Sequence, residues 1–155
     1  MIVHTGEALI DFIPTNDVHG RPAYAPVPGG SPYNTAVATA RLGVPNAFLG
    51  KISSDFFGDQ LVDHLEKNGV TLDFVVRDHR LSTLAFVKRS DTGEARYAFF
   101  AENAADRGFV ADEIPTVSES VEAIQFGSIS LIPDPVGATI LTVVQRERPR
   151  RVVSF

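Results

Sequence analysis

The stretch "PGGSPYNTAVATARLG", residues 28–43, decides the fold. Two adjacent glycines run directly into a segment whose apolar residues recur at helical spacing. Ser31 is a favourable N-cap residue, Pro32 suits the first helical position, and Gly43 is a common helix terminator. The sequence therefore predicts a helix that starts immediately after a glycine turn.

The glycine turn has two interpretations. Gly29 and Gly30 lack a Cβ, so the backbone can approach a ligand closely, and free N–H groups at the start of the helix would face that ligand. Asn34 could add a side-chain amide that both donates and accepts hydrogen bonds. The stretch lacks the G-x-x-x-x-G-K-[ST] and G-x-G-x-x-G phosphate-binding patterns. By itself it indicates either a ligand cradle or a plain tight turn.

A carboxylate, Asp11, lies within an apolar run that precedes the glycine turn. Residues 8–13, "ALIDFI", predict a short buried strand that carries Asp11 near its end. A buried carboxylate costs free energy unless it has hydrogen-bond partners, and the hydroxyl groups of a ligand are natural ones. Asp11, the two glycines and Asn34 at one sheet edge would suit a polyol better than a phosphate. The alternative is a carboxylate that caps a local turn.

Strands and helices alternate through the first half of the chain. Residues 46–53, "NAFLGKIS", predict a strand, and Asp55 can cap a second helix that ends at Gly69. With the strand at 8–13 and the helix after the glycine turn, the order is strand, helix, strand, helix. This order is typical of an α/β fold with a mostly parallel sheet and crossover helices.

The pattern then changes to a hairpin. "STLAFVKR" and "ARYAFFA", within residues 82–101, alternate in strand fashion around "SDTGE" at 90–94, which has the Asp and Gly of a turn. The proline-containing segment around 19–27 reads as an extended edge. We expect these segments to form a small sheet of their own, inserted between βα units.

The α/β pattern resumes after the hairpin and stops at Phe155. Residues 123–132 predict a strand and loop, Asp134 and Pro135 start a helix, and "RVVSF" at 151–155 predicts a last strand. A parallel strand with no following helix leaves one face of its sheet poorly covered. We therefore expect the 155 residues to be the front part of a longer α/β domain.

Composition excludes several classes of function. The chain has a formal net charge of −5 and a pI of about 5.3, so it lacks the general basic surface that nucleic acid requires. The basic run "RERPRR" at 146–151 falls where a helix should end, and cations stabilise that position. No apolar run approaches the ~20 residues of a membrane span. Cysteine is absent, and the four histidines lack ligand spacing, so we expect a soluble cytoplasmic protein without a metal site.

Four ordered motifs resemble one family. "GEALIDFIP", "PGGSPYNTAVATARLG", "FLGKISSDFFGDQL" and "FGSIS" occur in the order and spacing of the ribokinase-like (PfkB-type) carbohydrate kinases, and they are most similar to the fructokinase and 2-keto-3-deoxygluconate kinase branch. The resemblance covers essentially the whole chain. It implies a ribokinase-like α/β fold with a mostly parallel sheet, flanking helices and a small β lid, of which the C-terminal half is absent.

The resemblance also implies roles for individual residues. In the family, the positions matching Asp11, Gly29, Gly30 and Asn34 hold hydroxyls of the sugar. The hairpin matching 82–101 belongs to a lid that closes over the substrate, excludes water and often forms a homodimer contact. Phe86, Tyr97, Phe99 and Phe100 lie on two faces of that hairpin, and Phe86 and Phe99 are the ones we expect to touch the sugar.

Two departures from the family pattern limit the prediction. Many relatives in this branch carry an Arg at the position of Ala101, and here Ala101 is followed by Glu102, which favours a neutral sugar such as fructose. The family motif D-T-x-G-A-G-D, whose last Asp is the catalytic base, does not occur in these residues. "SDTGE" at 90–94 lacks its continuation and is interpreted as a turn. The base and the ATP and Mg²⁺ site are therefore expected beyond Phe155.

These observations leave several functions open. The leading hypothesis is a fructokinase-like enzyme that transfers a phosphoryl group from ATP to a sugar hydroxyl, with this chain as the sugar-binding half, inactive alone. The first alternative is a non-catalytic module that binds sugar or dimerises. The second is a 2-keto-3-deoxygluconate or nucleoside kinase of the same fold.

Overall fold

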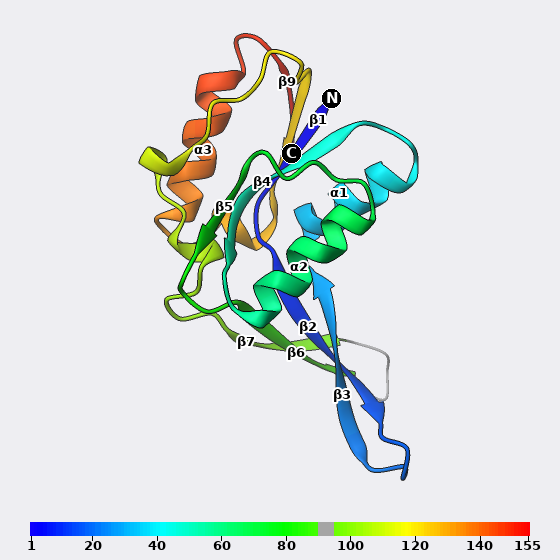
Figure 1. Cartoon of the computed structure of the whole chain (residues 1–155). Coiled ribbons are helices and arrows are strands. Elements are labelled where there is room, and N and C mark those ends of the chain that lie inside the picture. The colour runs from blue at the N-terminus through cyan, green and yellow to red at the C-terminus, as the bar shows by residue number, and fades with distance from the viewer. Residues whose placement is uncertain (90–94) are drawn as a thin grey trace.

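The computed structural model describes residues 1–89 and 95–155, and these form two sheets. The first is parallel, in the order β5-β4-β1-β8-β9, and consists of β1 (Ile2–Thr5), β4 (Asn46–Ser53), β5 (Val75–Asp78), β8 (Ala123–Phe126) and β9 (Val152–Ser154). The second, in the order β3-β2-β6-β7, consists of β2 (Leu9–Asn16), β3 (Pro22–Gly29), β6 (Thr83–Arg89) and β7 (Ala95–Phe100). We call the second sheet the lid, and it projects from one end of the parallel sheet (Figure 1).

Helices cover both faces of the parallel sheet. Helices α1 (Ser31–Arg41) and α2 (Phe56–Lys67) lie on one face and α3 (Val136–Glu147) lies on the other (Figure 1). Two buried apolar clusters correspond to these faces. The α1/α2 cluster includes Tyr33, Phe48 and Leu61, and the α3 cluster includes Leu49 and Ile140. The mostly parallel α/β architecture predicted from the alternation of strands and helices is confirmed.

The first strand differs from the prediction. Residues 8–13 were expected to supply the first strand of the parallel sheet, but that place belongs to β1, which pairs with β4 and β8. The chain turns at Gly6, whose φ of 154° suits glycine, and residues 8–13 enter lid strand β2 instead. β2 pairs with β3 in antiparallel and with β6 in parallel orientation. The predicted turn at 90–94 lies outside the described residues.

The start of α1 also differs in detail. Ser31 is the first helical residue rather than the N-cap, and Gly30 occupies the cap position with a φ of 110° and no side chain to accept a hydrogen bond. The Ser31 N–H donates instead to the carboxylate of Glu7, 2.9 Å away. At α2 the prediction is confirmed, because Asp55 accepts a hydrogen bond from the N–H of Gly58 at 2.7 Å.

A buried ion cluster joins the parallel sheet to the loop that follows the lid. The side chain of Lys51 is 3% exposed, and its Nζ lies 2.7 Å from Asp78 and 2.6 Å from Glu113. Asp78 also accepts from Arg80 at 2.6 Å. The Arg80 guanidinium, together with Lys51, holds the pKa of the Asp78 carboxyl well below its usual range. The cluster therefore connects β4, the end of β5 and the turn at Ala111–Glu113.

We expect Asp78→Asn to lower the free energy of unfolding by about 3 kcal/mol, because it leaves the buried Lys51 without one of its two carboxylates. Asp63→Asn is the matched control, since Asp63 forms an exposed pair with Lys67 at 3.7 Å and its loss should cost less than about 0.5 kcal/mol. Urea unfolding of both variants measures the difference. Equal stability losses in the two variants would contradict a structural role for the cluster.

Candidate functional site

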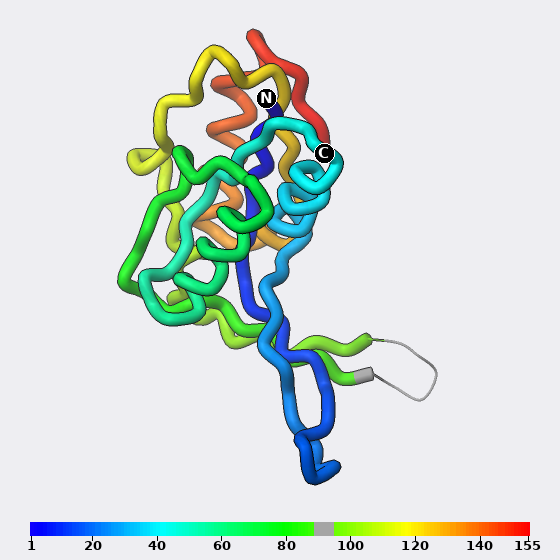
Figure 2. The backbone as a smooth tube through the Cα atoms, turned by 45° about the vertical axis from the view of Figure 1, so that its right-hand side comes forward, coloured from blue at the N-terminus to red at the C-terminus, as the bar shows by residue number. Residues whose placement is uncertain are grey.

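The strand order locates the candidate site at one end of the parallel sheet. From β1, the chain builds outward to β4 and β5 on one side, while β8 and β9 add on the other. Ligands in such sheets bind beyond the carboxyl ends of the two strands where the order reverses. Those strands are β1, which ends at Thr5, and β8, which ends at Phe126. Figure 2 shows that the lid strands extend away from this end of the sheet, opposite to the N-terminus.

Asp11 and the two glycines meet at this end of the sheet. Gly29 is the last residue of β3, and a Cβ on it would overlap Oδ2 of Asp11, so the carboxylate lies directly against the Gly29 backbone. A Cβ on Gly30 would overlap the backbone oxygen of Glu7. The Asp11 side chain is half-buried, and this burial raises the pKa of its carboxyl. Gly30, with a φ of 110° and the Glu7 backbone in the place of a Cβ, requires glycine, whereas a side chain at Gly29 would displace the Asp11 carboxylate.

Asn34 lies near this turn but does not join Asp11. Its backbone N–H donates to the carbonyl of Gly30 at 2.8 Å, which continues the helix. Its exposed side chain lines a hollow of about 610 Å³ together with residues of β3, α1 and α2, among them Pro28 and Arg41. In the part of the chain that the structure describes, no hydrogen bond links the Asn34 amide to the Asp11 carboxylate. A ligand role for Asn34 stays a prediction.

The two lid phenylalanines face opposite ways. Asp11 is paired with Ala85 and Ala85 with Phe99, so Asp11 and Phe99 lie on the same face of the lid. Phe86 follows Ala85 and therefore faces the other side. It stacks on Phe12 with ring centroids 4.5 Å apart. Phe99 is 44% exposed. A ligand role for Phe99 and for Phe86 stays a prediction, and Phe86 lies on the lid face opposite Asp11.

The sequence analysis missed two buried carboxylates at the same end of the sheet. Glu7, in the connection from β1 to β2, is 3% exposed and accepts hydrogen bonds from the Ser31 N–H and from the Ser128 hydroxyl at 2.7 Å. Asp106, at the start of the short 3₁₀ turn Asp106–Gly108, accepts from the Thr83 hydroxyl at 2.6 Å. Burial raises the pKa of Asp106 to about 6, and the charge of Glu7 adds to this effect.

Different signals could have found these two groups. Glu7 is the first carboxylate in the chain and belongs to a motif that was already singled out, "GEALIDFIP". Asp106 sits in "AENAADRGF", where nothing in the spacing separates it from a surface loop residue. Its burial depends on the return of the chain from the lid, which the local sequence does not encode.

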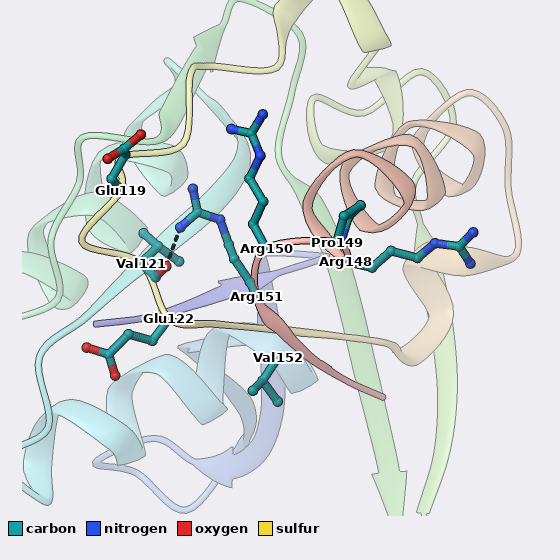
Figure 3. Close-up of a pocket in the computed structure, with 8 residues that line it drawn as sticks. All are labelled: Glu119, Val121, Glu122, Arg148, Pro149, Arg150, Arg151 and Val152. Atoms are coloured by element: carbon teal, nitrogen blue, oxygen red, sulfur yellow. Dashed lines mark hydrogen bonds between the residues drawn. The ribbon is translucent and has the colours of Figure 1, made fainter.

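A second hollow, of about 550 Å³, lies at the opposite edge of the sheet (Figure 3). It is lined by residues that precede β8 and β9, including Glu119, Glu122 and Arg150. Arg151 donates to the carbonyl of Val121 and pairs with Glu147 at 2.8 Å, as Figure 3 shows for the first contact. Arg146 and Arg151 therefore close the end of α3 through Glu147, whereas Arg148 and Arg150 are exposed.

The described residues do not fit an ATP or Mg²⁺ site. Within residues 1–89 and 95–155, no group of three or more His, Cys, Asp or Glu side chains could hold a metal ion. The glycine turn precedes a helix but lacks the lysine of a phosphate-binding loop.

No helix in the described residues is long and apolar enough to cross a membrane.

We expect Asp106→Asn to stabilise the protein increasingly as the pH rises from 4 to 6. The pKa of Asp106 is about 6 when folded and 3.8 in its ordinary state, so ionisation opposes folding and the native stability falls across this interval. The neutral amide removes that loss, up to about 3 kcal/mol at pH 7. Urea unfolding at pH 4.5, 5.5 and 7 measures it, with exposed Asp112→Asn as the control. A gain that does not change with pH would contradict the assignment.

Comparisons with known proteins agree with this architecture. The profile of the pfkB family carbohydrate kinases matches residues 1–152. A fructokinase of Rhizobium leguminosarum bv. trifolii is 41% identical over 155 residues, which are 100% of this chain and 47% of that protein. The crystal structure of a fructokinase from Xylella fastidiosa superimposes with a TM-score of 0.90 at 33% identity, over 99% of this chain and 49% of that one. The same enzyme with bound ATP gives a TM-score of 0.89.

The chain spans about half the length of the curated relatives it matches. The resemblance drawn from the four motifs is confirmed, as is the ribokinase-like fold that it implied. With the profile match over residues 1–152, the chain belongs to the pfkB family of carbohydrate kinases.

Proposed function

We propose that this chain is the sugar-binding part of an ATP-dependent kinase that phosphorylates a hydroxyl of a neutral sugar such as fructose. The observation that carries the proposal is the Asp11 carboxylate, packed against the bare backbone of Gly29 beside the end of β1. The relatives named above are fructokinases, of which the chain spans about half. In this proposal, the ATP site and the catalytic base lie in the part of the relatives' length that this chain does not span.

The clamp binds the sugar through a carboxylate and an accessible backbone. Ionised Asp11 accepts hydrogen bonds from two adjacent hydroxyls, and such charge-assisted bonds are the stronger kind. Gly29 and Gly30 let the sugar ring approach the chain, because no side chain intervenes. Asn34 on α1 and Phe99 on the lid complete the proposed set of contacts. ATP with Mg²⁺, when bound to the complete protein, supplies the phosphoryl group.

The lid covers the bound sugar, and residues at its end favour one class of sugar over another. Phe99 stands on the Asp11 face, so closure of the lid brings an apolar ring toward the bound sugar and excludes water from the reaction. Ala101 follows β7, where many relatives place an arginine, and Glu102 comes next. Without that cation and with an added carboxylate, the site favours a neutral sugar over a sugar acid such as 2-keto-3-deoxygluconate.

An apolar hollow at the base of the lid supports dimerisation, which is a further part of the proposal. A hollow of about 540 Å³ there is lined mainly by apolar side chains, including Phe56, Phe57, Leu81 and Phe100. Phe56 and Leu81 are 75% and 72% exposed. Large apolar side chains grouped on a surface are typical of an interface, and a second copy of the chain is the partner we propose.

We expect Asp11→Ala to raise the KM for the sugar about 10- to 100-fold in the protein at its natural length, because charge-assisted hydrogen bonds to the substrate are lost. The KM for ATP should change less than about twofold, since Asp11 lies on the sugar side of the site. Asp63→Ala, which removes an exposed carboxylate on α2, is the control. An unchanged sugar KM in Asp11→Ala would refute the assignment of the clamp.

Intact mass and calorimetry separate the kinase from the non-catalytic alternative. A mass near twice 16.8 kDa for the protein from its natural source, with turnover of fructose and ATP, is the expected result. A mass near 16.8 kDa with sugar binding and no turnover would identify a sugar-binding module instead. Preference for an adenosine-like ligand in the same titration would identify a nucleoside kinase.

A further inference from the structure

One buried carboxylate joins three segments that are distant in the sequence. Glu7 lies in the short connection from β1 to β2. Its Oε1 accepts from the Ser31 N–H at 2.9 Å and from the Ser128 hydroxyl at 2.7 Å. These donors belong to the start of α1 and to the loop after β8. The end of β1, the glycine turn and the end of β8 are thus linked through a single oxygen atom.

The contact with Ser31 replaces the missing helix cap. The first N–H groups of α1 have no partner within the helix, and the N-terminal end of a helix favours an anion. Gly30 cannot supply an acceptor, because it has no side chain. Its backbone lies against Glu7, since a Cβ on Gly30 would overlap the backbone oxygen of Glu7. The carboxylate and the backbone of Glu7 therefore hold the glycine turn from two sides.

The contact with Ser128 holds a strained loop. Ser128 has a φ of 72°, in the left-handed region that residues other than glycine rarely adopt. Its hydroxyl is committed to Glu7, so the hydrogen bond stabilises the conformation in which the loop leaves β8. The loop then continues into the 3₁₀ turn Ser128–Leu131 at the same end of the sheet.

We propose that Glu7 is a positioning residue for the sugar site, which sets the place of Gly29 and Gly30 relative to the ends of β1 and β8. The inference rests on the proposed function, because it takes these glycines to be the sugar clamp. Glu7 itself does not touch the sugar, since it is 3% exposed and its Oε1 is occupied by two protein donors. Glu7 acts by holding the backbone of Gly29 and Gly30, which does contact the sugar.

The role depends on the charge and not only on the shape of the side chain. Glutamine keeps the length of the side chain and one acceptor oxygen. Its amide nitrogen would replace Oε2, which is buried and has no hydrogen-bond partner among the described residues. A buried donor would then lack an acceptor, and the favourable interaction of an anion with the start of α1 would be lost. Glu7→Gln therefore loosens the clamp with little change in volume.

The test compares Glu7→Gln and Ser128→Ala with wild type and with Glu66→Gln, which alters an exposed glutamate on α2. In the protein at its natural length, we expect Glu7→Gln to raise the sugar Kd by calorimetry and the sugar KM about 5- to 10-fold, with the KM for ATP within twofold. Ser128→Ala should give a smaller rise, and the double variant should show less than the product of the two effects, because both act through one carboxylate.

The outcomes separate this inference from the proposed function. Wild type that neither binds nor phosphorylates a sugar would overturn the proposed function, and the inference with it. Wild type that does both, with unchanged sugar Kd and KM in Glu7→Gln and Ser128→Ala, would overturn the inference alone. Equal rises in the KM values for sugar and ATP would show general loosening and would also overturn it. If Glu7→Gln does not fold, Ser128→Ala decides the question by the same readouts.

Discussion

The central place of β1 is the constraint on which the rest of the structure depends. β1 is hydrogen-bonded to β4 on one side and to β8 on the other, so both of its edges are occupied. The chain leaves β1 at its carboxyl end, where Gly6 turns it into the lid. The later crossings between lid and parallel sheet, after β3, β5 and β7, lie at the same end of the sheet, which we call the junction. Glu7, Asp11 and the Gly29–Gly30 turn gather there because the connection is short and because β3 returns the chain from the lid to the start of α1.

This junction concentrates buried charge, which is costly unless every ion has partners. Lys51 meets Asp78 and Glu113, and the cluster is closed. Within residues 1–89 and 95–155, Glu7 and Asp106 form no ion pair; Glu7 accepts from an N–H and a hydroxyl, and Asp106 accepts from one hydroxyl. The first arrangement suits stability. The second leaves two buried carboxylates without a paired cation beside the proposed sugar site, and functional sites commonly carry such an energetic cost.

Local chemistry predicted the elements better than it predicted their partners. The turn and helix at 28–43 and the cap at Asp55 follow from short-range rules, and the structure has both elements. β1 was missed because "IVHT" is short and polar at its end, and the longer run at 8–13 was taken for it. The N–H at the start of α1 is capped by Glu7, which lies 24 residues from Ser31 in the sequence. Local capping rules consider only neighbouring residues, so they point to Ser31 as the cap. The sequence did not show that Phe86 lies on the lid face opposite Asp11, because the face of a strand residue depends on the strand register.

The two faces of the lid carry different side chains and make different contacts. The face opposite Asp11 is aromatic, and Phe12 meets Phe57 of α2 edge to face with centroids 5.7 Å apart. At the lid base, Asp55 accepts from both the N–H and the hydroxyl of Ser82 at 2.8 Å, and Asp106 accepts from Thr83. Two carboxylates thus fix the residues where β6 begins, while the strands beyond them project from the sheet. A closing movement that kept these bonds would have to bend the strands beyond Thr83. Asp11 pairs with Ala85 and Ala85 pairs with Phe99, so such a bend would carry Asp11 and Phe99 together relative to the parallel sheet.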